Sequence, residues 1–592
     1  MIAPAFGITG LVAVAVYVAA LLYVGLAAKR AQKNDSMGEF YLAGRGLGPF
    51  VLFATLYATQ YSGNSFLGYP GEAYRLGFAW IMSAGFMTAI IVAYLAIAPQ
   101  LHRASKAHAF VTPGDWLDHR FASPPLTLAA NLVFVAAISN YLLAQLMAMG
   151  HAVAGLSGGA IPYWVGVIAL TAVILVYETM GGMRAVAWTD AVQGGLLLVG
   201  LGGVFAAVLP TPAHLGAVTE WVAAAAPAKV AVPGWTLCMT WFSTLLLVGL
   251  SGSVYPQAIQ RIYAARSTRA LKRGISIMVV MPLVTMVPLF LVGILGLREL
   301  SGLEGIAADQ VMPMMLTMWA GSTPWLYAAA LAVMLAVIAA IMSTADSVLL
   351  TLSSIIAKDF MGKTVLKGAP DATLTRAGKF SSWAVIGVLV TIAVVPRITL
   401  WGLTELKMEM LLQVWPMFLL GVHWTRLTAP AALAGLIAGL VVSFALPLSS
   451  YARPFGLHDG TVGWAANLFV CVVVSKVTAP PFFLARWEQI RSCPRRSDRG
   501  RHRARLGRRY GTCLSQTRKE SNMAKYCPEC RTSCDTASCP TDAKGRCARC
   551  GKRPVEAAAS NRSWVWCSRH DEWHTTACAE DRGQHCCTAV AA

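Results

Sequence analysis

The chain has 592 residues, of which 56% are hydrophobic and 13% are charged, and its net charge is +20. Because soluble globular proteins carry about 25% charged residues, this composition excludes an assembly of soluble domains and, over most of the length, a disordered, collagen-like or disulfide-rich chain. The charge divides unevenly, with +9 on residues 1–485 and +11 on residues 486–592, and twelve of the fourteen cysteines follow residue 485. The sequence therefore predicts an all-α polytopic membrane body followed by a tail of different composition.

Thirteen apolar runs are predicted to cross the membrane as helices, since a hydrocarbon core of about 30 Å needs about 20 helical residues. Backbone groups in lipid must bond within their own segment, which favours helices. The first run has no cleavage site and is predicted to be an anchor rather than a removed signal peptide. The predicted spans are residues 6–27, 48–69, 77–99, 125–150, 161–180, 187–209, 235–258, 275–297, 324–352, 380–397, 404–424, 429–447 and 461–481.

The loops between these spans predict the orientation. With the N-terminus outside, the inner loops carry 19 Lys and Arg residues and the outer loops carry five. This asymmetry follows the positive-inside rule, so most of the basic charge of the body is interpreted as topology rather than nucleic-acid binding. We expect an integral protein of the plasma (inner) membrane with a cytoplasmic C-terminal tail. The inner loops are 28–47, 100–124, 181–186, 259–274, 357–379 and 425–428.

The second and seventh spans contain small polar residues and glycines that a lipid-facing helix does not need. Residues 58–70 read Ala-Thr-Gln-Tyr-Ser-Gly-Asn-Ser-Phe-Leu-Gly-Tyr-Pro, and residues 250–256 read Leu-Ser-Gly-Ser-Val-Tyr-Pro. Proline interrupts helical hydrogen bonding, and a pair of interrupted spans in two halves is typical of transporters built from inverted repeats. The alternative is two close helix contacts, which small residues also permit.

A polar segment separates the fifth span from the sixth. Residues 177–193 read Tyr-Glu-Thr-Met-Gly-Gly-Met-Arg-Ala-Val-Ala-Trp-Thr-Asp-Ala-Val-Gln. The pair Gly181-Gly182 predicts a tight cytoplasmic turn. Thr189 or Asp190 has the chemistry of an N-cap for the following helix.

The ninth span contains Ala-Ile-Met-Ser-Thr-Ala-Asp-Ser at residues 340–347. Ser343, Thr344 and Ser347 place hydroxyls on or near one helical face, although serines can also bond back to the preceding turn. Asp346 is ionisable, and a carboxylate at the centre of a span costs roughly 2.5–3.5 kcal/mol, which marks it as a candidate for function. The alternative is a position near enough to the cytoplasmic end for hydration.

The eleventh span contains three charged residues. Glu405, Lys407 and Glu409 are predicted at its outer end. Long side chains at the end of a span reach water. We therefore interpret these residues as a surface cluster rather than a solute site.

Three segments together resemble the sodium:solute symporter family. Residues 177–193 contain Gly-Gly-Met-x-Ala-Val-x-x-Thr-Asp-x-x-Gln, which is close to the best-known signature of the family. Residues 260–274 look like its basic loop after the first helix of the second repeat, and residues 340–347 look like its sodium-site helix. The resemblance covers about residues 1–485. It implies an inverted five-plus-five-helix core with broken first helices, made of spans 2–6 and 7–11, and alternating access around a central site.

The resemblance also implies that sodium is the coupling ion. Neutral carbonyl and hydroxyl oxygens suit a hard cation that must be released again. Asp190 matches the position that the family associates with the inner sodium exit route. Carried over by motif position, the sodium ligands are the backbone carbonyls of Ala58, Tyr61 and Ala340 and the hydroxyls of Ser343 and Thr344.

The solute is predicted from departures within the family. Proline permeases carry an Asp where Gln60 stands here, and an aromatic-rich seventh helix where this chain has Val-Gly-Leu-Ser-Gly-Ser at residues 248–253. Residues 64–80 look closer to the pantothenate and monocarboxylate permease branch. We therefore predict a sodium-coupled symporter that imports a small organic acid, with a sodium/proline-type symporter as the alternative. Hydrogen bonds to the carboxylate are predicted from Gln60, Ser62, Asn64 and Ser251.

The tail divides into two parts. Residues 486–522 are predicted to be a basic disordered linker, because they are rich in arginine and have little to bury. Beside a membrane helix, contact with the anionic lipids of the inner leaflet is favoured over nucleic acid. Residues 523–592 are predicted to form a small cysteine-rich, zinc-ribbon-like module.

The zinc prediction depends on two Cys-x2-Cys pairs that are sixteen residues apart, a spacing typical of zinc ribbons. Four thiolates can share one tetrahedral zinc ion. Cys534 and Cys539 could substitute for members of this set, and disulfides are the alternative, which a cytoplasmic location disfavours. The predicted ligands are Cys527, Cys530, Cys547 and Cys550 for one ion, and Cys567, His570, His574 and Cys578 for a second.

Other interpretations concern the tail and the class of protein. Residues 523–527 read Met-Ala-Lys-Tyr-Cys, like the start of a separate small protein, so a fusion or gene-boundary accident is an alternative origin for the tail. A membrane sensor that signals through the tail is the alternative function, although the tail has no kinase, cyclase or DNA-binding pattern. The body has no GxSxG, HExxH or P-loop motif. We therefore predict neither an enzyme nor an obligate protein partner.

Overall fold

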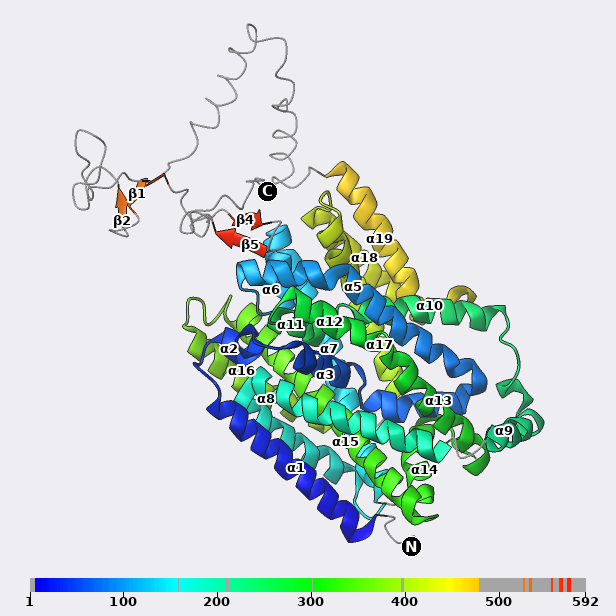
Figure 1. The fold of residues 1–592 in the computed structure, drawn as a ribbon. Coiled ribbons are helices and arrows are strands. Elements are labelled where there is room, and N and C mark those ends of the chain that lie inside the picture. The colour runs from blue at the N-terminus through cyan, green and yellow to red at the C-terminus, as the bar shows by residue number, and fades with distance from the viewer. Residues whose placement is uncertain are drawn as a thin grey trace, which may run out of the picture. The chain divides into compact units, whose positions relative to one another are not determined.

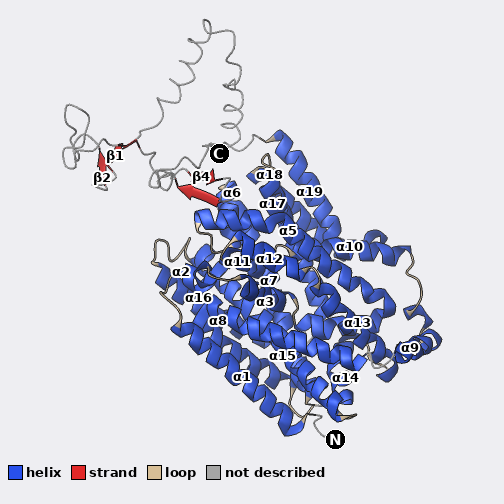
Figure 2. Ribbon diagram, viewed as in Figure 1, coloured by secondary structure: helices blue, strands red, loops and turns tan. Residues whose placement is uncertain are grey.

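The computed structural model describes residues 6–157, 159–208, 212–300, 302–395 and 399–478, together with five short strands of the tail. The chain divides into two compact units, Met1–Glu488 and Gln489–Ala592. The first unit is a bundle of helices (Figures 1 and 2). Its α-helices are α1 (Gly7–Arg30), α2 (Met37–Leu42), α3 (Pro49–Gln60), α4 (Tyr69–Leu76), α5 (Ser83–His108), α6 (Pro113–Phe121), α7 (Pro124–Leu156), α8 (Tyr163–Val208), α9 (Pro212–Ala225), α10 (Trp235–Gly252), α11 (Pro256–Ala264), α12 (Thr268–Met278), α13 (Met281–Glu299), α14 (Val311–Ala320), α15 (Pro324–Ile355), α16 (Asp371–Ala393), α17 (Leu400–His423), α18 (Ala429–Ala445) and α19 (Asp459–Val477).

The second unit contributes only short strands to the described residues. In one sheet β1 pairs antiparallel with both β2 and β3, and in the other β4 pairs antiparallel with β5. The predicted linker, residues 486–522, lies outside the described residues. The strands are β1 (Lys525–Cys527), β2 (Thr532–Cys534), β3 (Val555–Glu556), β4 (Trp564–Cys567) and β5 (Glu572–Thr575).

Nine stretches in the described part of the chain are long and apolar enough to cross a membrane. Two of them, Asn64–His108 and Tyr163–Val208, contain 45 and 46 residues. At about 1.5 Å per residue, each is about twice as long as a hydrocarbon core of about 30 Å. Each contains a glycine with positive φ, Gly77 at 71° and Gly182 at 53°, where the helix changes direction. The body is therefore a membrane-spanning helical bundle.

Helix α15 is the core of this bundle. Every residue from Ala336 to Ile355 is buried, as expected of a helix that is surrounded by protein on all sides. It packs most extensively against α8 and also contacts α7 and α3 (Figure 1). The polar residues of α15 are therefore held inside protein rather than in lipid.

The helices break at both places where the sequence predicts an interruption. Helix α3 ends at Gln60, Tyr61 has an extended backbone (φ −100°, ψ 93°), and a short π-helix, Asn64–Gly68, leads into α4. Helix α10 ends at Gly252, and α11 begins at Pro256. The carbonyls at such helix ends lack an intrahelical partner and are free to accept other bonds.

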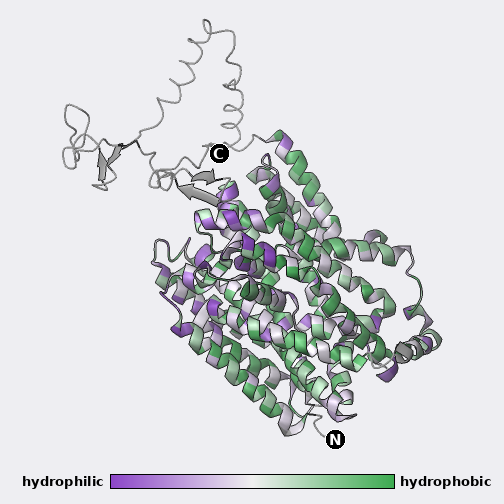
Figure 3. Ribbon diagram, in the orientation of Figure 1, coloured by the Kyte–Doolittle hydropathy of each residue, from purple (hydrophilic) through white to green (hydrophobic). Residues whose placement is uncertain are grey.

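Hydrophilic residues gather at one end of the bundle, around α2, α6, α11 and α12, whereas the outer helices along its length are mostly apolar (Figure 3). Apolar outer surfaces with hydrophilic residues at the end of the bundle are the pattern expected of helices that lie in a bilayer. Exposed Leu11, Val16 and Tyr23 on α1 belong to this apolar surface.

Candidate functional site

The broken end of α3 meets the middle of α15. The Ser343 hydroxyl lies 3.0 Å from the Ala58 carbonyl oxygen and 3.1 Å from the carbonyl oxygen of Ala340, and it can donate to one of them at a time. Tyr61 follows Ala58 by three residues at the same helix end. The carbonyl of Ala58 therefore loses its helical partner where α3 stops and receives a hydroxyl from α15 instead.

Thr344 stands next to Ser343 and is buried, yet its Oγ1 makes no hydrogen bond of ordinary geometry. An orphaned buried oxygen is uncommon and requires an explanation, such as an ion. The structure thus gathers Ala58, Ala340, Ser343 and Thr344 at one buried contact between α3 and α15.

A buried ion pair lies one turn of α15 further along. Arg261 on α11 and Asp190 on α8 have no exposed side-chain surface, and Arg261 Nη2 lies 3.0 Å from Asp190 Oδ2. Thr55 donates a short hydrogen bond to the same carboxylate oxygen and accepts one of 2.7 Å from Arg261 Nε. Arg261 also donates to the hydroxyl of Ser347 and, at 3.1 Å, to the carbonyl of Gln257. The pair therefore joins α3, α8, α11 and α15.

Two predictions for these residues are wrong. Asp190 and Thr189 do not cap a helix, because α8 continues through them and Thr189 donates to the carbonyls of Ala185 and Val186. Arg261 is not part of a cytoplasmic loop, because Pro256 starts a new helix that carries it into the protein. Asp190 and Arg261 are 71 positions apart in the sequence, so no local pattern indicates their pairing.

Asp346 extends this network rather than reaching water. It is fully buried. The Tyr177 hydroxyl donates to its Oδ2 at 2.7 Å, and Ser347 Oγ lies 3.1 Å from its Oδ1. Ser347 also lies 2.6 Å from the Ser343 carbonyl oxygen. A continuous set of polar contacts therefore runs from the Ser343 turn to the ion pair.

A small cavity of about 10 Å³, roughly the size that one water molecule needs, lies beside the break in α3. Three of the four predicted solute contacts, Gln60, Ser62 and Asn64, line it, whereas Ser251 does not. The hydroxyl of Ser251 is directed to its own helix at Leu247 and to the Met408 sulfur at 2.9 Å. The full lining is Gln60, Ser62, Asn64, Ser65, Tyr69, Met87, Ile90, Tyr141, Tyr255, Thr404, Lys407 and Met408.

The interpretation of the charged residues of α17 as a surface cluster is wrong for Lys407, whereas the half-buried Glu405 and Glu409 do lie together, beside His458. Lys407 is 1% exposed and lines the cavity, with its Nζ 3.3 Å from the ring centroid of Tyr141 and 4.7 Å from that of Tyr255. Glu405 instead pairs with Arg453 and His458. A helix turns about 100° per residue, so a residue two positions from both glutamates points to the opposite side of α17.

Only part of the predicted zinc ligand set falls within described residues. Cys527 ends β1, Cys567 ends β4, and His574 lies in β5, where it pairs in register with Val565. The other predicted ligands lie outside the described residues; they are Cys530, Cys547, Cys550, His570 and Cys578.

A membrane-spanning helical bundle with broken helices around a buried polar centre defines the class of a secondary transporter. The profile of the sodium:solute symporter family matches residues 40–439, and the chain belongs to this family. It is therefore a membrane transporter rather than an enzyme, with sodium and a solute as its ligands.

Individual relatives agree with this membership. The chain is 25% identical over 483 residues to the osmoregulated proline transporter OpuE of Bacillus subtilis (strain 168), covering 80% of this chain and 95% of the relative. It is 26% identical over 502 residues to the sodium/proline symporter of Staphylococcus aureus (strain JH9), covering 79% and 92%. The solved structure of a Na+-coupled sialic acid symporter in a substrate-bound outward-open state matches with a TM-score of 0.66 at 19% identity, covering 80% of this chain and 99% of that one. This last likeness shows the fold.

Proposed function

We propose that this chain is a secondary active symporter that uses sodium to import a small monocarboxylate or pantothenate-like acid by alternating access. The observation that supports it best is the contact between α3 and α15, where the Ser343 hydroxyl reaches the Ala58 carbonyl at 3.0 Å beside the unpaired hydroxyl of Thr344. Carbonyl and hydroxyl oxygens are the ligands of hard cations, and the absence of a carboxylate among them permits release.

The proposed sodium ligands are the carbonyls of Ala58, Tyr61 and Ala340 and the hydroxyls of Ser343 and Thr344. The proton of Ser343 now points to one of two carbonyls, Ala58 or Ala340. When sodium binds, the ion replaces this proton as the positive partner of both carbonyls, and the hydroxyl turns its lone pair to the ion.

Asp190 is proposed to serve the inner exit route of sodium. The set of polar contacts that passes through Ser347 begins one turn from the proposed ligands and ends at Asp190. Its Oδ2 is paired with Arg261, whereas Oδ1 has no hydrogen-bond partner. A sodium ion that leaves toward the inside meets this carboxylate. When no ion is present, the guanidinium of Arg261 balances the negative charge of Asp190.

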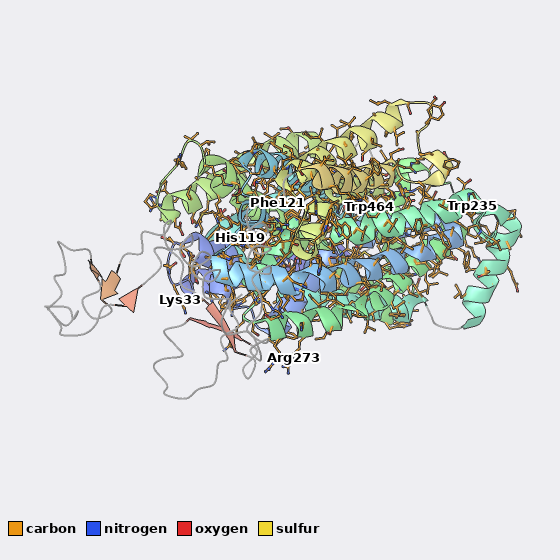
Figure 4. The ribbon with its side chains drawn as sticks, turned by 90° about the horizontal axis from the view of Figure 1, so that it is seen from above. Lys33, His119, Phe121, Trp235, Arg273 and Trp464 are labelled. Carbon is orange, nitrogen blue, oxygen red and sulfur yellow. The ribbon has the colours of Figure 1, made fainter. Side chains whose placement is uncertain are left out.

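The proposed topology has thirteen spans, with the N-terminus outside and the tail in the cytoplasm of a plasma-membrane protein surrounded by lipid. Helix α8 supplies two spans joined at Gly182, and the two five-span repeats run from α3 through α8 and from α10 through α17. The ends of the bundle differ in chemistry: Lys33 lies at one end and Trp235 at the other (Figure 4). Basic residues on the cytoplasmic side and aromatic residues at an interface support this orientation.

The domain division is also a proposal, with a transporter in residues 1–485, a linker in 486–522 and a zinc module in 523–592. The donor chemistry fits zinc, because two pairs of thiols supply the four ligands of a tetrahedral site. Cys527, Cys530, Cys547 and Cys550 would hold the ion. A bound zinc ion would supply the stability that a module this small cannot obtain from its core.

A sodium/proline-type symporter is the second candidate, because the two curated relatives are named for proline transport. Reconstituted full-length protein distinguishes the candidates. Vesicles with an inward sodium gradient are expected to accumulate labelled acetate, pyruvate or pantothenate, and to lose this uptake when sodium is replaced by choline. Accumulation of proline alone would favour the second candidate, and uptake that is independent of sodium would contradict both.

A further inference from the structure

Lys407 is a fully enclosed basic side chain that lines the cavity beside the α3 break. Its side chain is 1% exposed, and its ammonium lies against the faces of Tyr141 and Tyr255. Among the described residues no carboxylate forms an ion pair with it. Arg261, the one other Lys or Arg buried this completely in the described part of the chain, is paired with Asp190. The cavity is therefore lined by one basic group and no acidic group.

The acidic residues near Lys407 along α17 are not available to it. Glu405 is engaged by Arg453 and by His458 Nδ1, the latter at 2.7 Å. Glu409 Oε1 accepts from the backbone of Gly460 at 3.3 Å on the same side of the helix. Aromatic faces attract an ammonium, but a buried charge without a counter-ion is costly. A ligand that carries a negative charge would complete the site.

The rest of the cavity lining provides hydrogen bonds without charge. Gln60, Ser62 and Thr404 are neutral, and the Asn64 amide donates to Thr404 Oγ1 at 2.7 Å while its own Oδ1 has no partner. The lining contains neither Asp nor Glu. A solute with a single carboxylate matches this composition. A zwitterionic amino acid could pair its carboxylate with Lys407, but its ammonium would find no acidic side chain in the lining.

We infer that Lys407 is the counter-charge for the carboxylate of the transported solute, and that it makes the site select monoanionic acids over zwitterions and uncharged analogues. This inference rests on the proposed function, since it assigns the chemistry of the same solute site. Lys407 is a binding residue in this assignment, held in place by the rings of Tyr141 and Tyr255.

The first test uses the unaltered full-length protein in vesicles with an inward sodium gradient. Uptake of labelled pantothenate is compared with uptake of panthenol, its uncharged alcohol, and uptake of pyruvate with that of proline. Transport of an acid with at least tenfold discrimination against panthenol and proline supports the inference. Comparable uptake of the acid and its uncharged or zwitterionic counterpart overturns it, whatever the behaviour of any variant.

The second test replaces Lys407→Met, with Lys407→Arg as the charge-conserving variant. Losing one partner of a buried charge pair lowers affinity by about 30-fold or more, so Lys407→Met should raise the KM for the acid by at least that factor, and Lys407→Arg should retain more of the affinity. Lys379→Met is the matched control, because Lys379 also stacks on an aromatic ring, at 4.5 Å from Phe40, but does not line the cavity.

Thermal unfolding with and without sodium separates a lost solute site from a lost fold. A sodium-induced rise in the unfolding temperature of Lys407→Met, without the further rise that the acid gives the unaltered protein, supports the inference. An unchanged KM in Lys407→Met overturns the inference alone and leaves the symporter in place. No sodium-driven uptake of any solute by the unaltered protein overturns the proposed function and the inference together.

Discussion

Among the residues that the structure describes, two basic side chains are fully enclosed, Arg261 and Lys407, and their surroundings are opposite. Arg261 is paired with Asp190 at 3.0 Å and donates further hydrogen bonds to Thr55, Ser347 and Gln257. Lys407 has two tyrosine rings and an adjoining cavity instead. The protein itself supplies the counter-ion of Arg261, whereas it supplies none for Lys407 among the described residues.

This difference separates a polar contact that holds helices together from one that is ready for a ligand. Removing one partner of a complete buried pair leaves the other charge without a counter-ion, which lowers the free energy of unfolding. Replacing Lys407 leaves no buried partner without its counter-ion. We therefore expect a lower affinity for the solute rather than a lower stability of the fold. The following predictions test the contrast in order of decreasing effect.

The largest effect is expected from Arg261→Met. It leaves Asp190 buried without its counter-ion, and breaking a buried pair in this way costs about 3–5 kcal/mol. The double variant Arg261→Met/Asp190→Asn should recover most of the loss, because it removes both charges. The thermal unfolding midpoint of purified protein checks both. Equal midpoints for Arg261→Met and the unaltered protein would mean that Asp190 is not desolvated.

A somewhat smaller effect is expected at the proposed sodium ligands. Ser343→Ala combined with Thr344→Ala removes two hydroxyl ligands, and we expect sodium affinity to fall at least tenfold, which corresponds to about 1.4 kcal/mol. The sodium concentration that gives half-maximal uptake measures it. Ser353→Ala is the control, because that hydroxyl bonds back to Leu350 on the same helix. Sodium-driven uptake that survives the double change would refute the assigned ligands.

The bend that directs Asp190 toward Arg261 gives the third prediction. Gly182 has φ of 53°, and a Cβ there would meet Phe40, with its Cδ2 at 2.7 Å. Gly182→Ala should therefore cost about 1–3 kcal/mol. Gly195 lies in the same helix with open space around its Cβ position, so Gly195→Ala should add up to about 1 kcal/mol. Opposite shifts of the unfolding midpoint are expected, and equal shifts would argue against strain at Gly182.

The smallest effect is expected from ending the chain after Ala485. Both enclosed cations lie in the membrane body, so uptake kinetics and the unfolding midpoint should stay the same. Metal analysis should show zinc in the full-length protein and none in the shortened one. A changed KM in the shortened protein would connect the tail to transport.

Some of the site could be predicted from the sequence because its chemistry is local. Residues 340–347 carry hydroxyls within a single apolar span, and Gly181-Gly182 marks the bend of α8 without any knowledge of tertiary structure. Lys407 could not be placed, since its direction depends on which side of α17 packs inward. The lack of interaction between Lys407 and its two neighbouring glutamates follows from the turn of the helix and was available from spacing alone.

The Asp190–Arg261 pair illustrates the other limit. Its partners are 71 residues apart, and a basic residue near a predicted loop is reasonably interpreted as topology. The position of Arg261 depends on α11 restarting at Pro256 and entering the bundle. Packing of this kind is decided by contacts among four helices, which no local pattern records.

The single ammonium in the cavity also has a bioenergetic consequence. If one sodium ion accompanies each monocarboxylate, the charges of the cargo cancel, and the loaded and the empty carrier have the same net charge. The membrane potential, which is worth about 2.3 kcal/mol per charge at 100 mV, then contributes nothing to accumulation. The acid can be concentrated no further than the sodium ratio across the membrane, and imposing a potassium diffusion potential on the vesicles should leave that ceiling unchanged.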